Sequence, residues 1–313
     1  MWDSFYPHRF FPLTWDVSKI VTVITTCTGF YSIDPKYCDP FMYGIVLKEK
    51  LASNIKLFEV NAPAIAAKSR PGQFVILRVH ERGERFPITI ADASPEKGTV
   101  SIIFAEVGKS STQLGKLEVG DEILNFSGPL GNATKIQKYG EVLCVGGGVM
   151  AGALLYQVKA LKKAGNRITT ILGARSKEHL ILVEELRKES DEFHIATDDG
   201  SEGHEGIAFL SEMLKEKKFA QAITIGPTSM QMVVSEMTRP YIIPTTVNLF
   251  PIMVDGTGMC GACRVTVGGE TKFACVNGPD FDGHKVNYDE LISRMRFYNP
   301  NEKIAMVVFD GGE

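Results

Sequence analysis

The sequence predicts a multidomain protein in which an antiparallel β-barrel is followed by an α/β domain with a parallel sheet and by a small C-terminal subdomain. Three observations support this fold class. Short strand-like runs separated by Pro and Gly fill the first part of the chain, strand-like and helix-like segments alternate in the second, and three of the six cysteines fall within residues 254–275. A chain of 313 residues has room for two or three such domains.

Composition narrows the class of protein. The chain is 44% hydrophobic, which permits a substantial core, and its net charge of −3 gives no general basis for binding nucleic acid or an anionic membrane. The apolar stretch at residues 19–31 is too short for a membrane span or a signal peptide. The cysteines are locally grouped rather than spread over a small disulfide framework. We therefore expect a cytoplasmic protein.

The predicted barrel covers residues 42–137. Its strand-like runs are alternating or apolar, with Pro and Gly between them, and read YGIVLKEKLASNIKLFEVNAP, PGQFVILRVH, GTVSIIFAEVG and GDEILNFSGPLG. Residues 1–41 have aromatic and proline residues without clear periodicity, so we predict an N-terminal extension of unknown role.

The predicted α/β domain covers residues 138–244. Strand-like EVLCVGGG, NRITTILGAR, DEFHIATDDG and AQAITIGP alternate with helix-like segments, a pattern typical of a parallel sheet with helices on its faces. Residues 245–313 form the C-terminal subdomain. There, CRVTVGGETKFAC predicts a hairpin with a Gly-Gly turn and YDELISRMRF predicts a helix.

A glycine-rich turn, GGGVMAG at residues 146–152, joins the first strand of the α/β domain to a helix. This is the context of a turn that holds a phosphate group, although a tight turn without a ligand is the alternative. Three more loops, GARSKEH, ATDDGSEGHEG and GPTSM, follow parallel strands at the edge where ligands bind. The candidate nucleotide-binding residues are Gly146, Gly147, Gly148, Arg175, Asp198, Asp199, Gly226, Pro227 and Met230.

Arg175 is a candidate phosphate contact. One arginine can serve either a pyrophosphate or a 2′-phosphate, so it leaves NAD and NADP both open, and an ordinary surface arginine is the alternative.

The cysteine segment has the pattern D-x4-C-x2-C-x11-C, formed by Asp255, Cys260, Cys263 and Cys275. The hairpin brings Cys275 back beside the first two cysteines, and thiolates gathered in this way suit zinc or iron. Plant-type [2Fe–2S] proteins have C-x4-C-x2-C and a distant fourth cysteine, so Asp255 stands where the first thiolate would be. This spacing favours a [2Fe–2S] cluster, with a zinc knuckle or free thiols as alternatives.

These motifs, in order, resemble the ferredoxin–NADP reductase superfamily, and more narrowly the iron–sulfur flavoprotein subunits typified by the electron-transfer subunit of dihydroorotate dehydrogenase. The resemblance covers about residues 43–290 and rests on PGQFVILRV, RFPITIAD, GKSSTQLGKLEVGDEILNFSGPLGN, VGGGVMAGALL with GARSKE, TDDGS, GPTSM and the cysteine segment.

That family implies FAD on the barrel. The resemblance places the flavin ring along RFPITIAD and the pyrophosphate at the GKSST loop, where the serine and threonine hydroxyls are alternatively ordinary turn or cap groups. The family's usual arginine position is occupied here by Phe86, with Arg85 one residue earlier. The implied FAD-binding residues are Arg85, Phe86, Pro87, Ile88, Thr89, Gly108, Ser110, Ser111 and Thr112.

Aspartate at position 255 is similar to the small subunit of NADH-dependent reduced ferredoxin:NADP oxidoreductase, an electron-bifurcating enzyme whose close relatives are also called sulfide dehydrogenase. This resemblance implies FAD, a [2Fe–2S] cluster and NAD(H) in this chain. It also implies a larger partner subunit with two [4Fe–4S] clusters, FAD and an NADP site, through which ferredoxin is reached indirectly. No separate catalytic acid or base is expected.

Two alternative functions remain from the sequence. One is the electron-transfer subunit of dihydroorotate dehydrogenase, in which cysteine occupies the place of Asp255. The other is a zinc-stabilised regulatory protein that binds a nucleotide.

Overall fold

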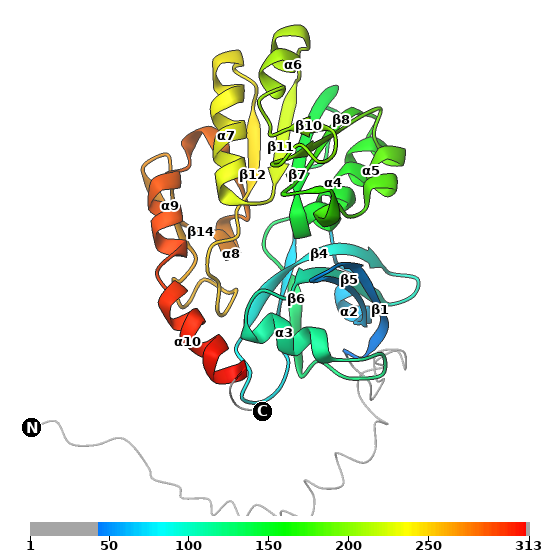
Figure 1. The fold of residues 1–313 in the computed structure, drawn as a ribbon, viewed down its shortest axis with the longest axis vertical. Helices are drawn as coiled ribbons and strands as arrows, with labels where there is room; N and C mark the ends of the chain where they lie inside the picture. The colour runs from blue at the N-terminus through cyan, green and yellow to red at the C-terminus, as the bar shows by residue number, and fades with distance from the viewer. Residues whose placement is uncertain (1–42, 311–313) are drawn as a thin grey trace, which may run out of the picture. The chain divides into compact units, whose positions relative to one another are not determined.

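Two large sheets dominate residues 43–310, the part of the chain that the computed structural model describes (Figure 1). The predicted N-terminal extension, with Cys27 and Cys38, lies outside the described residues. No helix in the described part of the chain is long and apolar enough to cross a membrane.

The first sheet is the predicted antiparallel barrel. Its strand order is β1-β2-β5-β4-β3-β6, and every neighbouring pair is antiparallel. The strands are β1 (Ile45–Ala52), β2 (Ile55–Asn61), β3 (Phe74–Arg78), β4 (Phe86–Ser94), β5 (Thr99–Ala105) and β6 (Asn125–Leu130). Two short helices, α2 (Pro63–Ala66) and α3 (Lys109–Lys116), complete this part of the chain.

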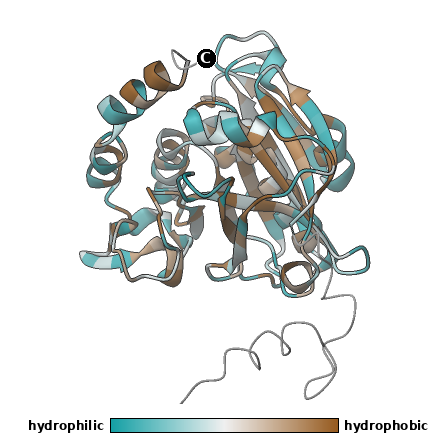
Figure 2. Cartoon of the chain, turned by 90° about the horizontal axis from the view of Figure 1, so that it is seen from below, coloured by the Kyte–Doolittle hydropathy of each residue, from teal (hydrophilic) through white to brown (hydrophobic). Residues whose placement is uncertain are grey.

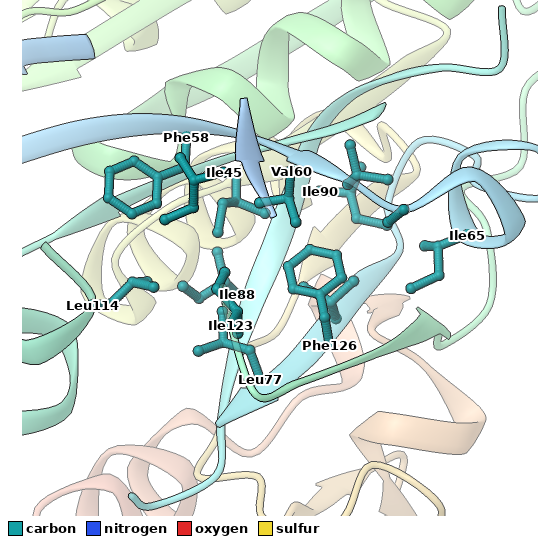
Figure 3. Packing of buried hydrophobic residues seen from close by; sticks show 14 of the residues in the cluster. Ile45, Phe58, Val60, Ile65, Leu77, Ile88, Ile90, Leu114, Ile123 and Phe126 are labelled. Atoms are coloured by element: carbon teal, nitrogen blue, oxygen red, sulfur yellow. The ribbon is translucent and has the colours of Figure 1, made fainter. Parts of the chain in front are cut away.

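The period of two along the strands separates the two faces of this sheet. Inward-facing side chains form a buried apolar core that includes Phe58, Leu77, Ile88, Ile90 and Phe126 (Figure 3). Residues between them face outward, because successive side chains of a strand point to opposite sides.

The second sheet is the predicted parallel sheet, ordered β10-β9-β8-β7-β11-β12-β15. Its strands are β7 (Glu141–Gly147), β8 (Arg167–Ala174), β9 (Glu192–Thr197), β10 (His204–Glu205), β11 (Gln221–Ile225), β12 (Thr245–Asn248) and β15 (Asp280–Asp282). The helices between strands are α4 (Ala151–Lys163), α5 (Val183–Glu189), α6 (Leu210–Glu216) and α7 (Thr228–Thr238), with short 3-10 turns η2 (Gly148–Met150), η3 (Lys177–His179), η4 (Arg239–Tyr241) and η5 (Gly283–Lys285).

This sheet extends beyond residue 244. Strand β12 is parallel to β11, and β15 pairs with β12 antiparallel. The cysteine segment therefore leaves the sheet after β12 and returns to it at β15.

The cysteine segment contains the predicted hairpin, formed by β13 (Arg264–Val267) and β14 (Glu270–Phe273). Its turn residues Gly268 and Gly269 both have positive φ, 62° and 80°, which explains why glycine occupies both places. Helices α8 (Ala274–Asn277) and α9 (Tyr288–Met295) follow.

A last helix, α10 (Asn299–Asp310), was not predicted from the sequence. It runs toward α3 of the barrel, where Lys116 Nζ lies 4.8 Å from the centre of the Phe309 ring (Figure 1). Its apolar residues Ile304, Val307 and Val308 are exposed, and Figure 2 shows apolar colouring on this helix near the C-terminus.

A buried carboxyl group, that of Asp280, lies at the junction of barrel, parallel sheet and cysteine segment. Its Oδ1 accepts a hydrogen bond from Asn248 Nδ2 at 2.5 Å, and the same amide lies 3.4 Å from the Gly72 carbonyl oxygen of the barrel. Asp280 Oδ2 is buried and has no hydrogen-bond partner within residues 43–310. Burial is the main reason why the pKa of Asp280 is raised from 3.8 to about 6.

The variant Asp280→Asn is expected to remove a pH dependence of stability. Because the pKa of Asp280 is higher in the folded than in the unfolded chain, the folded chain binds more protons, and the free energy of unfolding falls as the pH rises toward this pKa. Between about pH 4 and pH 7 the wild type should lose about 2 kcal/mol relative to the variant. Chemical denaturation of both proteins over this range measures the difference, and parallel pH curves would contradict it.

Candidate functional site: a nucleotide pocket, a barrel face and a cysteine loop

The carboxyl ends of the parallel strands form one wall of a cavity of about 580 Å³. Six predicted nucleotide-binding residues line it: Gly147, Gly148, Arg175, Asp198, Pro227 and Met230. Gly146, Asp199 and Gly226 are not among the lining residues. The glycine turn, the strand-end loops and the start of α7 thus meet at one place, as the parallel topology requires.

Close packing explains the glycines of this turn. A Cβ on Gly147 would lie 2.3 Å from the Gly173 carbonyl oxygen, and a Cβ on Gly146 would lie 2.8 Å from the Leu154 side chain. Gly148 has open space around it but a φ of 58°, a conformation that glycine adopts readily. The turn therefore lets strand, loop and helix approach each other at the cavity floor.

The barrel supplies the opposite wall of this cavity. Asn54, Ile55, Ala105 and Val107 line it, and none of them was predicted from the sequence. Val107 is 76% exposed and directly precedes the GKSST loop. An apolar residue next to this glycine turn was the feature of the sequence that marked the barrel side of the cavity. His179, Ile207, Ser229 and Val233 were also missed.

Strand β4 presents only part of the RFPITIAD motif on the outer face of the barrel. Phe86 and Ile88 pack with the barrel core, so their side chains are not on that face and their backbone alone is available to a cofactor there. Arg85 is exposed, and Thr89 is buried with its hydroxyl 3.4 Å from Met150 Sδ in the turn before α4.

The GKSST loop forms the start of α3. The Ser111 hydroxyl oxygen accepts from the Gly108 backbone N–H at 3.1 Å and donates to the Gly108 carbonyl at 3.0 Å, so it acts as a helix cap. Ser110 Oγ donates to Glu84 Oε2 at 3.0 Å. The space where a Cβ on Gly108 would point is open, so the backbone at the N-terminus of α3 can be approached by an anion. Thr112 contributes its backbone N–H to the first helical turn, with Gly108 as acceptor.

The four predicted cluster ligands lie in two pairs. Cys263 Sγ and Cys275 Sγ are 3.2 Å apart and buried, whereas Cys260 is exposed. The Asp255 carboxylate accepts from the Cys260 backbone N–H at 2.9 Å and from the Thr257 backbone N–H at 3.0 Å. Within residues 43–310, no three or more His, Cys, Asp or Glu side chains are already arranged as a closed metal-binding group.

The loop from Asp255 to Cys263 turns tightly. Gly256, Gly258 and Gly261 all have positive φ, between 65° and 85°, and so wrap the chain tightly around the candidate ligands. Burial raises the pKa of Cys275 to about 12, while the hydrogen bond from the Thr257 backbone N–H lowers the pKa of Asp255. A bound metal must therefore replace the thiol protons, as soft metals do with cysteine ligands.

The cysteine pair belongs to an apolar cluster shared with the barrel. Cys263 and Cys275 pack in the same buried cluster as Phe74 and Ile76 of β3. Phe74 is the cross-strand partner of Thr89, so the two side chains share the outer face of the barrel. The cysteine pair and the face predicted to hold the flavin ring are thus neighbours.

An antiparallel barrel joined to a parallel-sheet domain with a nucleotide-type cavity defines the ferredoxin reductase-like class of proteins. Phthalate dioxygenase reductase, a modular protein for electron transfer from pyridine nucleotides to [2Fe–2S], shares this fold at a TM-score of 0.52 and 19% identity, over 74% of this chain and 88% of that one. Within the class, residues 251–287 match the model of the iron–sulfur cluster binding domain of dihydroorotate dehydrogenase B. The chain belongs to the family of dihydroorotate dehydrogenase B electron-transfer subunits and their homologues, as the 48% identity with a relative over 83% of this chain shows.

Two relatives align with this chain over nearly their whole length. The dihydroorotate dehydrogenase B electron-transfer subunit homologue of Thermotoga maritima is 48% identical over 83% of this chain and 93% of its own. A solved structure of NADH-dependent reduced ferredoxin-NADP oxidoreductase, described for flavin-based electron bifurcation, contains a chain that is 46% identical, with a TM-score of 0.81 over 86% of this chain and 98% of that one.

Proposed function

We propose that this chain is the electron-transfer subunit of an NADH-dependent reduced ferredoxin:NADP oxidoreductase, with FAD on the barrel, NAD(H) in the cavity and a [2Fe–2S] cluster at the cysteine loop. One observation carries the proposal. A single buried cluster joins Cys263 and Cys275 to Phe74, whose cross-strand partner Thr89 lies on the face expected to hold the flavin. When bound, FAD converts between hydride exchange with NAD(H) and single-electron exchange with the cluster.

The residues of this chain would position the flavin and enclose the nicotinamide. Thr89 offers a hydroxyl group to a ring edge on the outer face of the barrel, and the N-terminus of α3 offers backbone N–H groups to a pyrophosphate. The cavity between Val107 and Gly147 admits a nicotinamide between the two domains. No side chain is needed as an acid or base, because hydride transfer moves no separate proton.

The donor set fits a two-iron cluster. Cys263 and Cys275 form one proposed pair of ligands, because their sulfurs are already in close contact. Asp255 and Cys260 form the other, because the Asp255 carboxylate accepts the Cys260 backbone N–H and so lies in the same turn as the Cys260 side chain. Two sulfur ligands of one tetrahedral metal lie about 3.8 Å apart, so the 3.2 Å pair needs only a small opening. An aspartate oxygen is a harder and less electron-donating ligand than a thiolate, and we expect it to raise the reduction potential of the cluster.

The partner is proposed to dock around exposed Cys260. A cavity of about 410 Å³ beside it is lined by Arg264, Arg294, Phe297 and Tyr298, and Met259 nearby is 89% exposed. Arginine and aromatic side chains are enriched at protein interfaces. The expected partner is the larger iron–sulfur flavoprotein subunit, with two [4Fe–4S] clusters, FAD and an NADP site.

A second candidate is the electron-transfer subunit of dihydroorotate dehydrogenase. The Thermotoga maritima relative is named as a homologue of that subunit. Aspartate rather than cysteine at position 255 favours the first candidate. Family membership favours both over a zinc-stabilised regulatory protein.

Purification of the native complex tests the proposal. We expect a yellow-brown complex that contains flavin, iron and sulfide, whose flavin absorption is bleached by NADH without air, and which includes a larger iron–sulfur flavoprotein. Copurification of an FMN-containing dihydroorotate dehydrogenase instead would establish the second candidate. A colourless complex containing zinc would refute both.

A further inference from the structure

A hydrogen bond joins the barrel to the glycine turn at the edge of the nucleotide cavity. The Thr89 hydroxyl of β4 donates to Met150 Sδ at 3.4 Å. Residues 147–149 of the turn line the cavity, and Met150 directly follows them in η2. This contact therefore lies at the boundary between the proposed nicotinamide cavity and the barrel face proposed for the flavin ring.

Close packing between α4 and the barrel holds Met150 at this boundary. Met150 is the residue directly before α4, and the second residue of that helix is Gly152. A Cβ on Gly152 would lie 2.8 Å from Ala91 Cβ and 2.7 Å from Ile103 Cδ1, which belong to strands β4 and β5. The start of the helix is thus in direct contact with the strand that carries Thr89, and this packing fixes where Met150 lies.

The Thr89 hydroxyl can change its hydrogen-bond partner. Thr89 is 5% exposed, and among residues 43–310 its hydroxyl bonds to Met150 alone. A hydroxyl group has one hydrogen to donate and two lone pairs that accept, and its hydrogen rotates to suit the partner. A thioether sulfur is a weak acceptor and has no hydrogen to donate. The hydroxyl can therefore turn its hydrogen to a stronger acceptor on the barrel face, and return it to the sulfur when that acceptor is lost.

A flavin ring offers an acceptor of this kind only while it is oxidised. The ring nitrogen that receives a hydride accepts a hydrogen bond in the oxidised ring, and it carries a hydrogen and donates in the reduced ring. Because the hydride would arrive from the nicotinamide cavity, this nitrogen belongs at the boundary where Thr89 and Met150 meet. The Thr89 hydroxyl would then donate to the ring in the oxidised protein and accept from it in the reduced protein.

We infer that Met150 is a positioning residue that favours the reduced flavin, because its sulfur accepts the Thr89 hydrogen when the ring nitrogen no longer can. Without this sulfur, the reduced protein has a buried hydroxyl hydrogen with no acceptor, whereas the oxidised protein loses no hydrogen bond. The inference rests on the proposed function and deepens it, because it assigns a residue of the nucleotide turn to the tuning of the flavin.

Anaerobic titration of the native complex with mixtures of NADH and NAD⁺ tests this at equilibrium, without a rate measurement. The signal is the absorption of the flavin that NADH bleaches. Met150→Leu conserves the side-chain volume and removes the sulfur. The ratio of NADH to NAD⁺ that half-reduces the flavin should rise about tenfold in this variant. For a two-electron couple this equals a reduction potential about 30 mV lower. The oxidised variant should keep its full flavin content.

Variants of Thr89 distinguish this coupling from a general change of polarity near the ring. Valine has the shape of threonine without the hydroxyl, so Met150→Leu should have no further effect when it is added to Thr89→Val. Beside Thr89→Ser, which keeps a hydroxyl, it should keep its effect. Met213→Leu is the matched control, because Met213 lies in a buried cluster beneath α6 that contains no barrel residue, and it should leave the ratio unchanged.

Three results would overturn the inference while leaving the proposed function intact: an unchanged ratio in Met150→Leu, an equal rise when the substitution is added to Thr89→Val, or an equal rise in Met213→Leu. Loss of flavin from oxidised Met150→Leu would overturn it as well, because the sulfur has no assigned role in that state. A wild-type complex without flavin would refute the flavin site of the proposed function, and the inference with it.

Discussion

Replacement of Cys263 with serine is expected to abolish the iron–sulfur centre. Cys263 is 1% exposed and its sulfur lies 3.2 Å from that of Cys275, and we propose that these two sulfurs are the ligands at the buried side of the loop. A serine hydroxyl is a harder donor that does not match a thiolate as a ligand of iron in a sulfide cluster. We expect metal affinity to fall by more than the roughly 10- to 100-fold that the loss of a group supporting a ligand causes. Iron and sulfide analysis, visible absorption and electron paramagnetic resonance of the reduced protein measure the loss.

Asp255→Cys provides the matched control for that experiment. It completes an all-sulfur set at the same four positions, so iron and sulfide should be retained, and the stronger electron donation of a thiolate should lower the reduction potential. Retention of the full iron content by Cys263→Ser would contradict the proposed ligand set. An unshifted potential in Asp255→Cys, measured by redox titration, would show that Asp255 is not a ligand.

Gly147→Ala should have the second large effect, on both stability and nucleotide binding. The new Cβ would lie 2.3 Å from the carbonyl oxygen of Gly173, which is backbone of the adjacent strand and cannot rotate away. The strands must separate, at a cost of about 3 kcal/mol, and this separation occurs at the floor of the cavity. We expect a lower denaturation midpoint together with a rise of roughly tenfold or more in the NADH concentration needed to bleach the flavin.

Gly148→Ala is the control that distinguishes this steric clash from a general sensitivity of the glycine turn to any substitution. Its Cβ would meet open space, and the strain of φ = 58° costs about 1 kcal/mol. Equal losses of stability in the two variants would refute the close approach of β7 and β8 as the cause. A Gly147→Ala protein with unchanged stability and unchanged response to NADH would refute the assigned role of the turn.

Local patterns in the sequence were sufficient to predict the order of strands and helices in the α/β domain. Hydrophobic periodicity predicted the two sheets, and consecutive glycines at 268 and 269 predicted a tight hairpin turn whose positive φ values the structure confirms. The D-x4-C-x2-C-x11-C spacing predicted that Asp255 takes the place of the first thiolate in a set of four ligands, and this stays a prediction; in the structure the Asp255 carboxylate accepts the Cys260 backbone N–H at 2.9 Å.

The errors in the predicted site and the missed helix concern which face of a strand or helix is buried. A resemblance between sequence motifs does not reveal this. All five residues of RFPIT were predicted at the cofactor, yet Phe86 and Ile88 alternate into the barrel core. The Ser111 hydroxyl is used as a helix cap. Helix α10 was missed because exposed Ile304, Val307 and Val308 give no pattern of a helix buried against its own chain.

The cysteine segment is an excursion that starts from one strand of the sheet, β12, and ends in its neighbour, β15. In a chain that has not acquired iron, no metal centre joins the two ends of this long loop. We therefore expect disorder to spread first to β15, the strand at which the loop returns to the sheet. Loss of β15 would leave β12 with an open row of backbone hydrogen-bonding groups, which invites pairing between molecules. Iron delivery would then govern solubility as well as electron transfer, and chains made under iron starvation would be candidates for aggregation or proteolysis.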